Sequence, residues 1–533
     1  MASYLFKCAT VVDGSGSPAF RSDVAVRDGR ITTVGTGGAA GATIIDAEGL
    51  VLAPGFIDIH SHTDSTLFNY PHMESKAFQG VTLEVTGNCG LGVFPVRQSH
   101  RKEFSDFLRM HDFTLPGGDF AWSDFSSYAD AVERAGIALH QAPLVGHASL
   151  RIAGLGLENR PPTEAELERM RHLLEEALSQ GAWGMSTGLI YPPGSYATTE
   201  EIIALARILA RSSAIYTSHI RGEGESLYDA LDEAVRIGRE AEVRVQISHL
   251  KAMGQSNRGG ARKVLERLAK ARGTGVDIAA DQYPYHASAT TLSAIVPQWA
   301  HEGGVASLLE RLQDQELSER IMAEMAREIA QREGASGIVV SNCATRANRP
   351  LSGRTLEQVG RHWGCTPEEA AARLIVEEEG AVGAIFFSMA EEDVEEILKE
   401  RGVAVGSDGN ALEAGGAAGE ATHPRSYGTF PRVLGHYVRE RQLLSLESAV
   451  HKMTGLPAQR IGLSDRGVIR PGFAADLVLF DPATIADRAD YSQPHRYAQG
   501  VVHLFVDGEP VIENGKGTGN LPGRVLRRGQ VKK

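Results

Sequence analysis

The sequence lacks the features that mark membrane, secreted and nucleic-acid-binding proteins. Nowhere in its 533 residues do roughly 18 apolar residues run without interruption, so no membrane-spanning helix is expected. The first residues, MASYLFKCATVVDG, lack the basic region and apolar run of a secretory signal. Basic residues do not predominate either, since the net charge is −13. This charge argues against a nucleic-acid partner, because such binding draws most of its affinity from a basic surface.

Cysteine is also scarce. The four cysteines, Cys8, Cys89, Cys343 and Cys365, are scattered without a paired spacing. This is typical of free thiols in a reducing compartment rather than of a disulfide framework. A cytoplasmic protein without nucleic-acid or membrane partners is therefore expected. The sequence leaves open whether the chain forms a homo-oligomer.

Both ends of the chain consist of short strand-like segments separated by turns. β-branched residues alternate with Gly, Asp and Ser in the first fifty residues, and Asp507-Gly508 is a hairpin signal near the other end. Neither end is long enough to bury a sheet face by itself. We therefore expect residues 1–54 and 462–533 to meet in one small β-sandwich domain.

The region between the two ends alternates apolar strand-like runs with amphipathic helical stretches. Strands that alternate with helices predict a parallel sheet, and eight such units predict a closed (β/α)8 barrel of the TIM type. We assign residues 55–461 to this α/β barrel. More than a hundred residues separate the last two strand candidates, so an inserted subdomain is expected at about residues 287–346. The eight candidate strands are GFIDIHSH, VTLEVTGNCG, HQAPLVGHASL, AWGMSTGL, AIYTSHI, VRVQISHL, VDIAADQYPY and VAVGSDG.

Several candidate strands end in metal-ligand or acidic residues, at the end of a barrel where active sites are assembled. Residues two apart in a strand share a face, so the pair His60 and His62 can point at one ion. A lone histidine at such a position is more often structural than a ligand. Six candidates at the same end of eight ordered strands make coincidence a poor explanation, and together they are a zinc-type ligand set. The six are His60, His62, Cys89, His219, His249 and Asp408.

The pattern of HxH on the first strand, His on the fifth and sixth, and Asp on the eighth resembles the amidohydrolase superfamily. Longer motifs are similar to the D-aminoacylase, or N-acyl-D-amino-acid deacylase, family, and the resemblance covers most of the chain including both ends. The most specific of them are GNCG around Cys89 and HPRSYGTFPR around Arg425. The other motifs are GMSTGLIYPPGSYATTEE, SHIRGEG, ISHLKAMG and DQYPY.

The resemblance implies a metal centre with one tightly held zinc ion. Its ligands would be Cys89, His219 and His249. His60, His62 and Asp408 would form an adjacent second position, either empty or weakly filled. Asp408 would also accept a proton from water and later donate it to the departing amine.

The expected reaction is hydrolysis of the amide bond of an N-acyl-D-amino acid to a carboxylate and a free D-amino acid. Arg425 is able to bind the α-carboxylate in a bidentate manner. The resemblance implies that Lys251, Tyr191 and Tyr283 assist it, and Lys251 shares a strand face with His249. The segment YPYHASATTLSAIVPQW contains no Arg or Lys, which favours neutral or apolar D-side chains.

Two alternatives remain. The first is a cyclic amide hydrolase such as a hydantoinase or dihydroorotase. The fourth candidate strand, AWGMSTGL, has no lysine that could be carboxylated to bridge two metals, and Cys89 would take that role, so this alternative is disfavoured. The second is an inactive scaffold of the same fold, which the presence of all six candidate residues disfavours.

Overall fold

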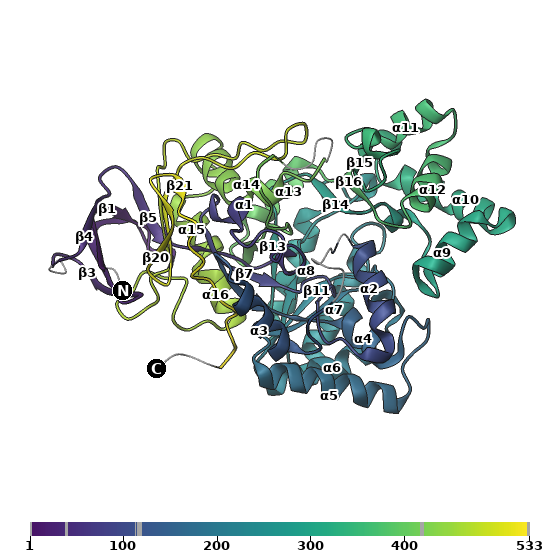
Figure 1. The fold of residues 1–533 in the computed structure, drawn as a ribbon, viewed down its shortest axis with the longest axis horizontal. Coiled ribbons are helices and arrows are strands. Elements are labelled where there is room, and N and C mark those ends of the chain that lie inside the picture. Colours follow the sequence, from purple (N-terminus) through teal and green to yellow (C-terminus); the bar gives the residue numbers. More distant parts are fainter. Residues whose placement is uncertain (1–2, 38–40, 112, 114–119, 416–420, 530–533) are drawn as a thin grey trace.

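The structure is a computed structural model that describes residues 3–37, 41–111, 113, 120–415 and 421–529. It has a central barrel with a β-rich domain at one end and a mostly helical insertion at the other (Figure 1). Within the described residues, no helix combines the length and the apolar character that crossing a membrane requires.

The β-rich domain is one nine-stranded sheet to which both ends of the chain contribute. In Figure 1 the purple N-terminal strands and the yellow C-terminal strands lie side by side at the left. The two ends meet where β5 pairs antiparallel with β18. The strand order is β21 (Lys516–Gly517), β20 (Glu509–Glu513), β19 (Val501–Val506), β18 (Leu477–Phe480), β5 (Val51–Pro54), β1 (Ser3–Val11), β2 (Phe20–Arg27) and β3 (Arg30–Val34), with β4 (Thr43–Asp46) on β1.

The central strands are parallel and follow one another in chain order. They form one sheet with the order β6-β7-β8 and a second with the order β9-β10-β11-β12-β13-β17. A parallel bridge between Ser61 and Gly409 joins the last strand to the first and closes the ring. The strands are β6 (Phe56–Asp58), β7 (Val81–Thr86), β8 (His140–Pro143), β9 (Val145–Gly146), β10 (Gly184–Gly188), β11 (Ile215–His219), β12 (Arg244–Ile247), β13 (Ile278–Gln282) and β17 (Val403–Val405).

Helices surround these strands, as the apolar spacing of their sequences predicts. The α/β barrel fold expected from the sequence is confirmed. The helices between the first seven strand units are α1 (Glu74–Ala77), α2 (Arg101–Met110), α3 (Phe125–Ala135), α4 (His147–Leu155), α5 (Glu164–Gln180), α6 (Thr199–Arg211), α7 (Leu227–Ala241) and α8 (Ala261–Gly273). Those after β17 are α14 (Arg425–Arg432), a π-helix over Val433–Glu440, α15 (Leu446–Met453) and α16 (Gly455–Ile461).

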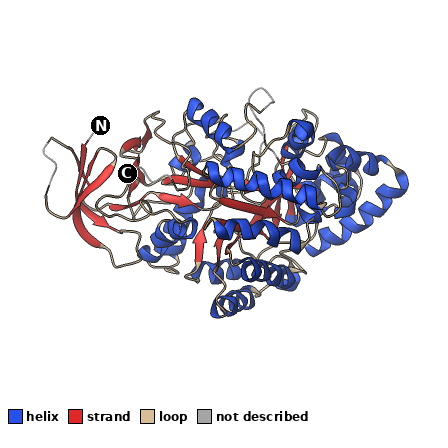
Figure 2. Cartoon of the chain, turned by 90° about the horizontal axis from the view of Figure 1, so that it is seen from below, coloured by secondary structure: helices blue, strands red, loops and turns tan. Residues whose placement is uncertain are grey.

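The insertion between β13 and β17 has its own small sheet and its own hydrophobic core. Figure 2 shows its helices at the end of the molecule opposite the terminal sheet. Its sheet has the order β14-β16-β15, and β16 lies beyond residue 346, the expected end of the insertion. The residue boundaries of the insertion and of the two domains stay predictions. The elements are β14 (Ala287–Thr291), α9 (Gly304–Gln313), α10 (Gln315–Gln331), β15 (Ile338–Cys343), α11 (Leu356–Trp363), α12 (Pro367–Glu377) and β16 (Val382–Phe387). The next helix, α13 (Glu391–Lys399), packs Ile397 and Leu398 into the barrel core instead.

Candidate metal centre

The six candidate residues of the strand ends come together at the carboxyl-terminal face of the barrel. They form two groups that share Cys89, and within each group the possible ligand atoms all lie within 4.8 Å of one another. His60 and His62 both follow β6, and the other four side chains reach the same place from the ends of four further strands, as a closed barrel allows. The first group is Cys89, His219 and His249, and the second is His60, His62, Cys89 and Asp408.

The first group has the donor atoms and the spacing of a zinc site. Sγ of Cys89 lies 3.4 Å from Nε2 of His249, and that nitrogen lies 2.9 Å from Nδ1 of His219. One thiolate and two imidazoles are zinc ligands, with Zn–N bonds of about 2.0 Å and Zn–S bonds of about 2.3 Å. The residues therefore fit a zinc ion.

Three members of the two groups have a strained backbone. Cys89, His249 and Asp408 have φ angles of 53°, 36° and 52°, in the left-handed region that non-glycine residues rarely adopt. Such strain costs about 1–3 kcal/mol for each residue and persists where the surrounding structure enforces it, often at functional sites. The left-handed backbone thus occurs at three of the residues whose side chains converge on the two groups.

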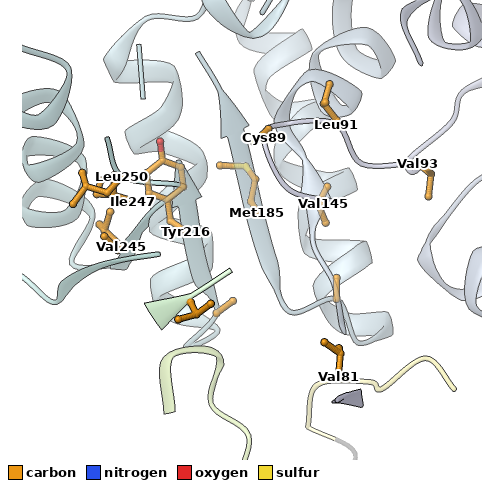
Figure 3. Close-up of a cluster of buried hydrophobic side chains, with 14 of the residues drawn as sticks. Val81, Cys89, Leu91, Val93, Val145, Met185, Tyr216, Val245, Ile247 and Leu250 are labelled. Atoms are coloured by element: carbon orange, nitrogen blue, oxygen red, sulfur yellow. The ribbon is translucent and has the colours of Figure 1, made fainter. Parts of the chain in front are cut away.

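Cys89 lies among buried apolar side chains that restrict its position. Figure 3 shows Cys89 and Leu91 at the upper end of a buried hydrophobic cluster, above Val145 and beside the strand that carries Met185. These four side chains belong to the large barrel core, and Cys89 is only 4% exposed. A thiol held in this way loses little rotational freedom when it binds a metal.

Neighbouring charges favour the thiolate form of Cys89. Burial raises the pKa of this thiol, but His60, His249 and His219 lower it, and the net pKa lies well below the ordinary value. Since the thiolate and not the thiol is the metal ligand, the site is prepared for a cation.

The second group is built around the carboxylate of Asp408. Its Oδ1 lies 3.0 Å from Nε2 of His62 and 3.3 Å from Nε2 of His60, while its Oδ2 lies 2.7 Å from Nη1 of Arg425. Burial raises the pKa of Asp408, but Arg425 and the histidines lower it, and the net pKa is well below the ordinary value. Asp408 is therefore ionised and able to accept a proton.

Asp281 and Glu223 were not predicted from the sequence, although both support the ligands. Oδ1 of Asp281 lies 2.9 Å from Nδ1 of His60 and also accepts a hydrogen bond from the His249 backbone amide at 2.8 Å. Oε1 of Glu223 lies 3.0 Å from Nδ1 of His249 and accepts a hydrogen bond from Lys251. Carboxylates in this position orient metal-binding histidines.

The four side chains predicted to bind substrate lie on the wall of a cavity of about 1070 Å³, together with most of the candidate ligands. Nζ of Lys251 and Cζ of Arg425 both lie over the Tyr283 ring, 5.6 Å and 5.0 Å from its centroid. Tyr191 lies apart from them. Its ring packs against His219 with centroids 5.1 Å apart, and its hydroxyl is 2.9 Å from Oγ1 of Thr290 in the insertion.

A set of buried charges lies behind the second group. The ammonium group of Lys76 is fully buried, with its Nζ 2.7 Å from Oδ2 of Asp58 and 3.1 Å from Oε1 of Glu84. It also donates a hydrogen bond to Oγ of Ser407 at 2.6 Å. These contacts tie together the two strand ends that carry His60 and Asp408.

Comparisons with known proteins agree with this geometry. Residues 43–512 match the amidohydrolase family. The chain is 40% identical over 520 residues to a D-aminoacylase from Alcaligenes xylosoxydans xylosoxydans, covering 97% of this chain and 96% of that protein. It is 38% identical over 532 residues to an N-acyl-D-aspartate deacylase from the same organism, covering 99% and 96%.

Solved structures give the same result. An N-acyl-D-glutamate deacylase from Bordetella bronchiseptica, crystallised with zinc and a phosphonate mimic of the tetrahedral intermediate, is 34% identical and superposes with a TM-score of 0.83 over 98% of this chain and 99% of that one. A D-aminoacylase crystal structure is 37% identical, with a TM-score of 0.82 over 98% and 99%. Dihydropyrimidinase from Brevibacillus agri, at 16% identity and a TM-score of 0.56, shares the fold. The chain therefore belongs to the amidohydrolase family, within its D-aminoacylase and N-acyl-D-amino-acid deacylase group.

Proposed function

We propose that this protein hydrolyses the amide bond of N-acyl-D-amino acids, giving a carboxylate and a free D-amino acid. The observation that carries the proposal is the position of Asp408, between two histidines of the second ligand group and the guanidinium of Arg425. One cavity thus contains a proton acceptor (Asp408), the candidate metal ligands, and a cation (Arg425) that is able to bind the substrate carboxylate. The D configuration rests on the relatives, which act on D-amino-acid derivatives.

The proposed ligands of the tightly held zinc ion are Cys89, His219 and His249. His60, His62 and Asp408 would hold a second, weakly bound ion. When bound, zinc supplies Lewis-acid activation of water and of the scissile carbonyl. Asp281 and Glu223 keep the rings of His60 and His249 in orientation through their Nδ1 atoms.

Asp408 is the proposed general base and acid. Its ionised carboxylate takes a proton from the attacking water and donates it to the nitrogen of the departing amine, so the amide C–N bond breaks to give a neutral amine. Positioned proton transfer of this kind contributes roughly 10²–10⁴-fold to a rate.

Arg425, Lys251 and Tyr283 are proposed to hold the α-carboxylate of the substrate. The Tyr283 hydroxyl is buried and has no hydrogen-bond partner among the described residues, so it is available to donate to that carboxylate. Tyr191 is proposed to contact the substrate beside His219.

Neutral or apolar D-side chains are the proposed preference. Lys251 and Arg425 are assigned to the α-carboxylate, and the other described arginine and lysine side chains on the cavity wall are paired with carboxylates, so an acidic side chain would lack a cation of its own. These pairs are Arg221 with Glu233 at 2.9 Å and Arg332 with Glu328 at 2.6 Å.

A panel of N-acetyl and N-formyl amino acids, each offered as both enantiomers to zinc-loaded protein, tests the function. We expect release of free amine from the D-forms, ranked with neutral side chains above D-aspartate and D-glutamate. Turnover of L-forms alone would contradict the proposal. If the protein hydrolyses hydantoins or dihydropyrimidines but no N-acyl amino acid, the cyclic amide alternative is favoured. If it hydrolyses none of these compounds, an inactive scaffold is favoured.

The substrate is a small molecule, and a cytoplasmic location is proposed from the thiol chemistry. All four cysteines are free, and Cys89 is needed as a thiolate, which suits a reducing compartment. Measuring activity and zinc content after incubation with an oxidant tests this requirement.

A further inference from the structure

The cavity has an apolar arm that the chemistry described so far does not use. We define the apolar arm by Phe107 and Met110 of α2, Leu157 after α4, and Ile295, Val305 and Val382 of the insertion, all on the cavity wall. Pockets of about 300–1,000 Å³ hold drug-sized ligands. The whole cavity, at about 1070 Å³, exceeds what an N-acetylated small amino acid would fill.

The apolar arm is continuous between the barrel and the insertion. A Cβ atom built on Gly380 would lie 2.8 Å from Val305 and 3.7 Å from Met110, so these two side chains flank the same point. A Cβ built on Gly304 would lie 2.7 Å from Leu157. Met110 also packs against the hydrophobic core of the insertion.

A row of rings connects the apolar arm to the metal centre. The rings of Phe107 and His111 have centroids 4.9 Å apart, those of His111 and Tyr191 are 5.1 Å apart, and those of Tyr191 and His219 are 5.1 Å apart. The row therefore runs from His219, a proposed metal ligand, along Tyr191 and His111 to Phe107 of the arm.

The order of groups along the substrate decides which part of it enters the arm. In an N-acyl amino acid the carboxylate, the Cα atom, the amide nitrogen and the acyl carbonyl follow one another. The substrate carboxylate is proposed to bind Arg425 and Lys251, and the scissile carbonyl to lie at the zinc site that contains Cys89. The acyl group then extends away from Arg425, toward His219 and Tyr191. The D-side chain branches from the Cα atom and stays near the carboxylate end.

The two histidines beside the arm are uncharged near neutral pH. Burial lowers the pKa of His111 to about 3, with a further contribution from the charges of His62 and His301. Burial also lowers the pKa of His301 to about 4. Asp106, which faces the cavity from α2, is paired with Lys102 at 2.6 Å.

We propose that the apolar arm binds the acyl group, and that the protein prefers N-acyl-D-amino acids with an extended apolar acyl chain over their N-acetyl counterparts. This inference rests on the proposed function. The reaction itself is unchanged: water adds to the acyl carbonyl, the C–N bond breaks, and a fatty acid anion and a free D-amino acid are released.

A series of acyl chain lengths on one D-amino acid tests the proposal. We expect kcat/KM to rise by roughly fourfold for each added methylene group, since burying one is worth about 0.8 kcal/mol, until the arm is full. The series runs from acetyl through butyryl and hexanoyl to octanoyl. A flat or falling series with good turnover of the acetyl substrate would overturn the inference while the proposed function stands. No turnover of any member would instead remove the proposed function.

Val305→Asp places a charge in the arm, and Ala306→Asp is its matched control on the exposed side of the same helix. We expect Val305→Asp to lower the octanoyl-to-acetyl ratio of kcat/KM at least tenfold, and Ala306→Asp to leave it unchanged. Val305→Thr, which keeps the side-chain shape, provides a milder version should the charged variant fold poorly. An unchanged ratio in both Val305 variants would contradict the proposal.

A second series distinguishes the acyl group from the D-side chain. It keeps the acetyl group and lengthens the side chain from D-alanine to D-norvaline and D-norleucine. We expect the Val305 variants to leave this series unaltered. Loss of side-chain discrimination, with the acyl series intact, would show that the arm holds the side chain and would overturn the inference.

Discussion

The guanidinium of Arg425 lies 2.7 Å from Oδ2 of Asp408, while Oδ1 of the same carboxylate faces the rings of His60 and His62. The cation proposed to hold the substrate carboxylate thus sits directly against the proposed proton acceptor. In an N-acyl amino acid only the Cα atom separates the carboxylate from the amide nitrogen. A substrate whose carboxylate binds Arg425 therefore has its amide nitrogen close to Asp408. Substitutions at the two residues should therefore affect different kinetic quantities.

Asp408→Asn should abolish most turnover and leave the fold and the tightly bound zinc in place. The amide cannot accept the proton of water, so kcat should fall by roughly 10²–10⁴-fold. The ligands of the first group, Cys89, His219 and His249, are untouched. Steady-state kinetics together with zinc analysis of the purified variant provide the measurement. Activity near that of the wild type would rule out the assigned role.

Arg425→Gln should impair substrates that carry an α-carboxylate. A charge-assisted hydrogen bond contributes about 1.5–3 kcal/mol, which corresponds to roughly 10–100-fold in kcat/KM. The matched comparison is the α-carboxamide of the same N-acyl-D-amino acid, which lacks the anion. The wild type should prefer the carboxylate, and the variant should lose most of that preference. An unchanged preference would place the carboxylate elsewhere.

The clustering of the six candidate ligands could be predicted because each of them follows a local pattern. HxH after a strand, or a single polar residue at the end of an apolar run, is visible without knowing the tertiary structure, and the closed barrel then places these ends together. The position of Arg425 beside Asp408 fits the role predicted for it, although the segment between them gave no means of locating it.

Asp281 and Glu223 could not be predicted in the same way. Asp281 follows the strand-end pattern within DQYPY, but its contact with His60 exists only after the barrel has closed. Glu223 lies in a loop, where no periodicity marks it, and reaches His249 from the neighbouring strand unit. The extent of the insertion could not be predicted from a local pattern either, because β16 pairs with strands that lie far earlier in the chain.

Cys89→Ala should lose the tightly bound zinc. Without the thiolate only two imidazoles remain in the first group, too few for a stable zinc site. Cys343→Ala is the matched control, because this cysteine is also buried but lies on β15 of the insertion. Metal analysis after dialysis should show zinc in the control and not in Cys89→Ala. Full zinc content in Cys89→Ala would show that other residues bind the tightly held zinc ion.

Lys76→Met should destabilise the barrel strongly. Removing the buried ammonium leaves Asp58 and Glu84 without a counter-charge, and breaking a buried ion pair in this way typically costs about 3–5 kcal/mol. Lys102→Met is the control, because Lys102 is 89% exposed in its pair with Asp106, and exposed pairs contribute little. Urea-induced unfolding followed by circular dichroism should show a much lower midpoint for Lys76→Met. Equal midpoints for both variants would contradict this reading of the buried charges.

His301 should make the folded state sensitive to mild acid. Burial lowers the pKa of this histidine from 6.5 to about 4. Between these two values the unfolded chain binds a proton that the folded protein does not, so stability falls as the pH decreases from 6.5 toward 4. The full effect is at most about 3.5 kcal/mol, since one pKa unit corresponds to about 1.4 kcal/mol.

His301→Gln, which keeps a hydrogen-bond donor, should therefore lose less stability than the wild type between pH 7 and pH 5. Thermal unfolding midpoints at both pH values provide the measurement. His172→Gln, at an exposed position of α5, is the control and should respond to pH as the wild type does. The proposed zinc ligands are the same in all three proteins, so acid release of the metal contributes equally and cancels in the comparison. An identical pH response of His301→Gln and the wild type would mean that this ring is solvated in the folded protein, and the apolar arm would then be open to water at His301.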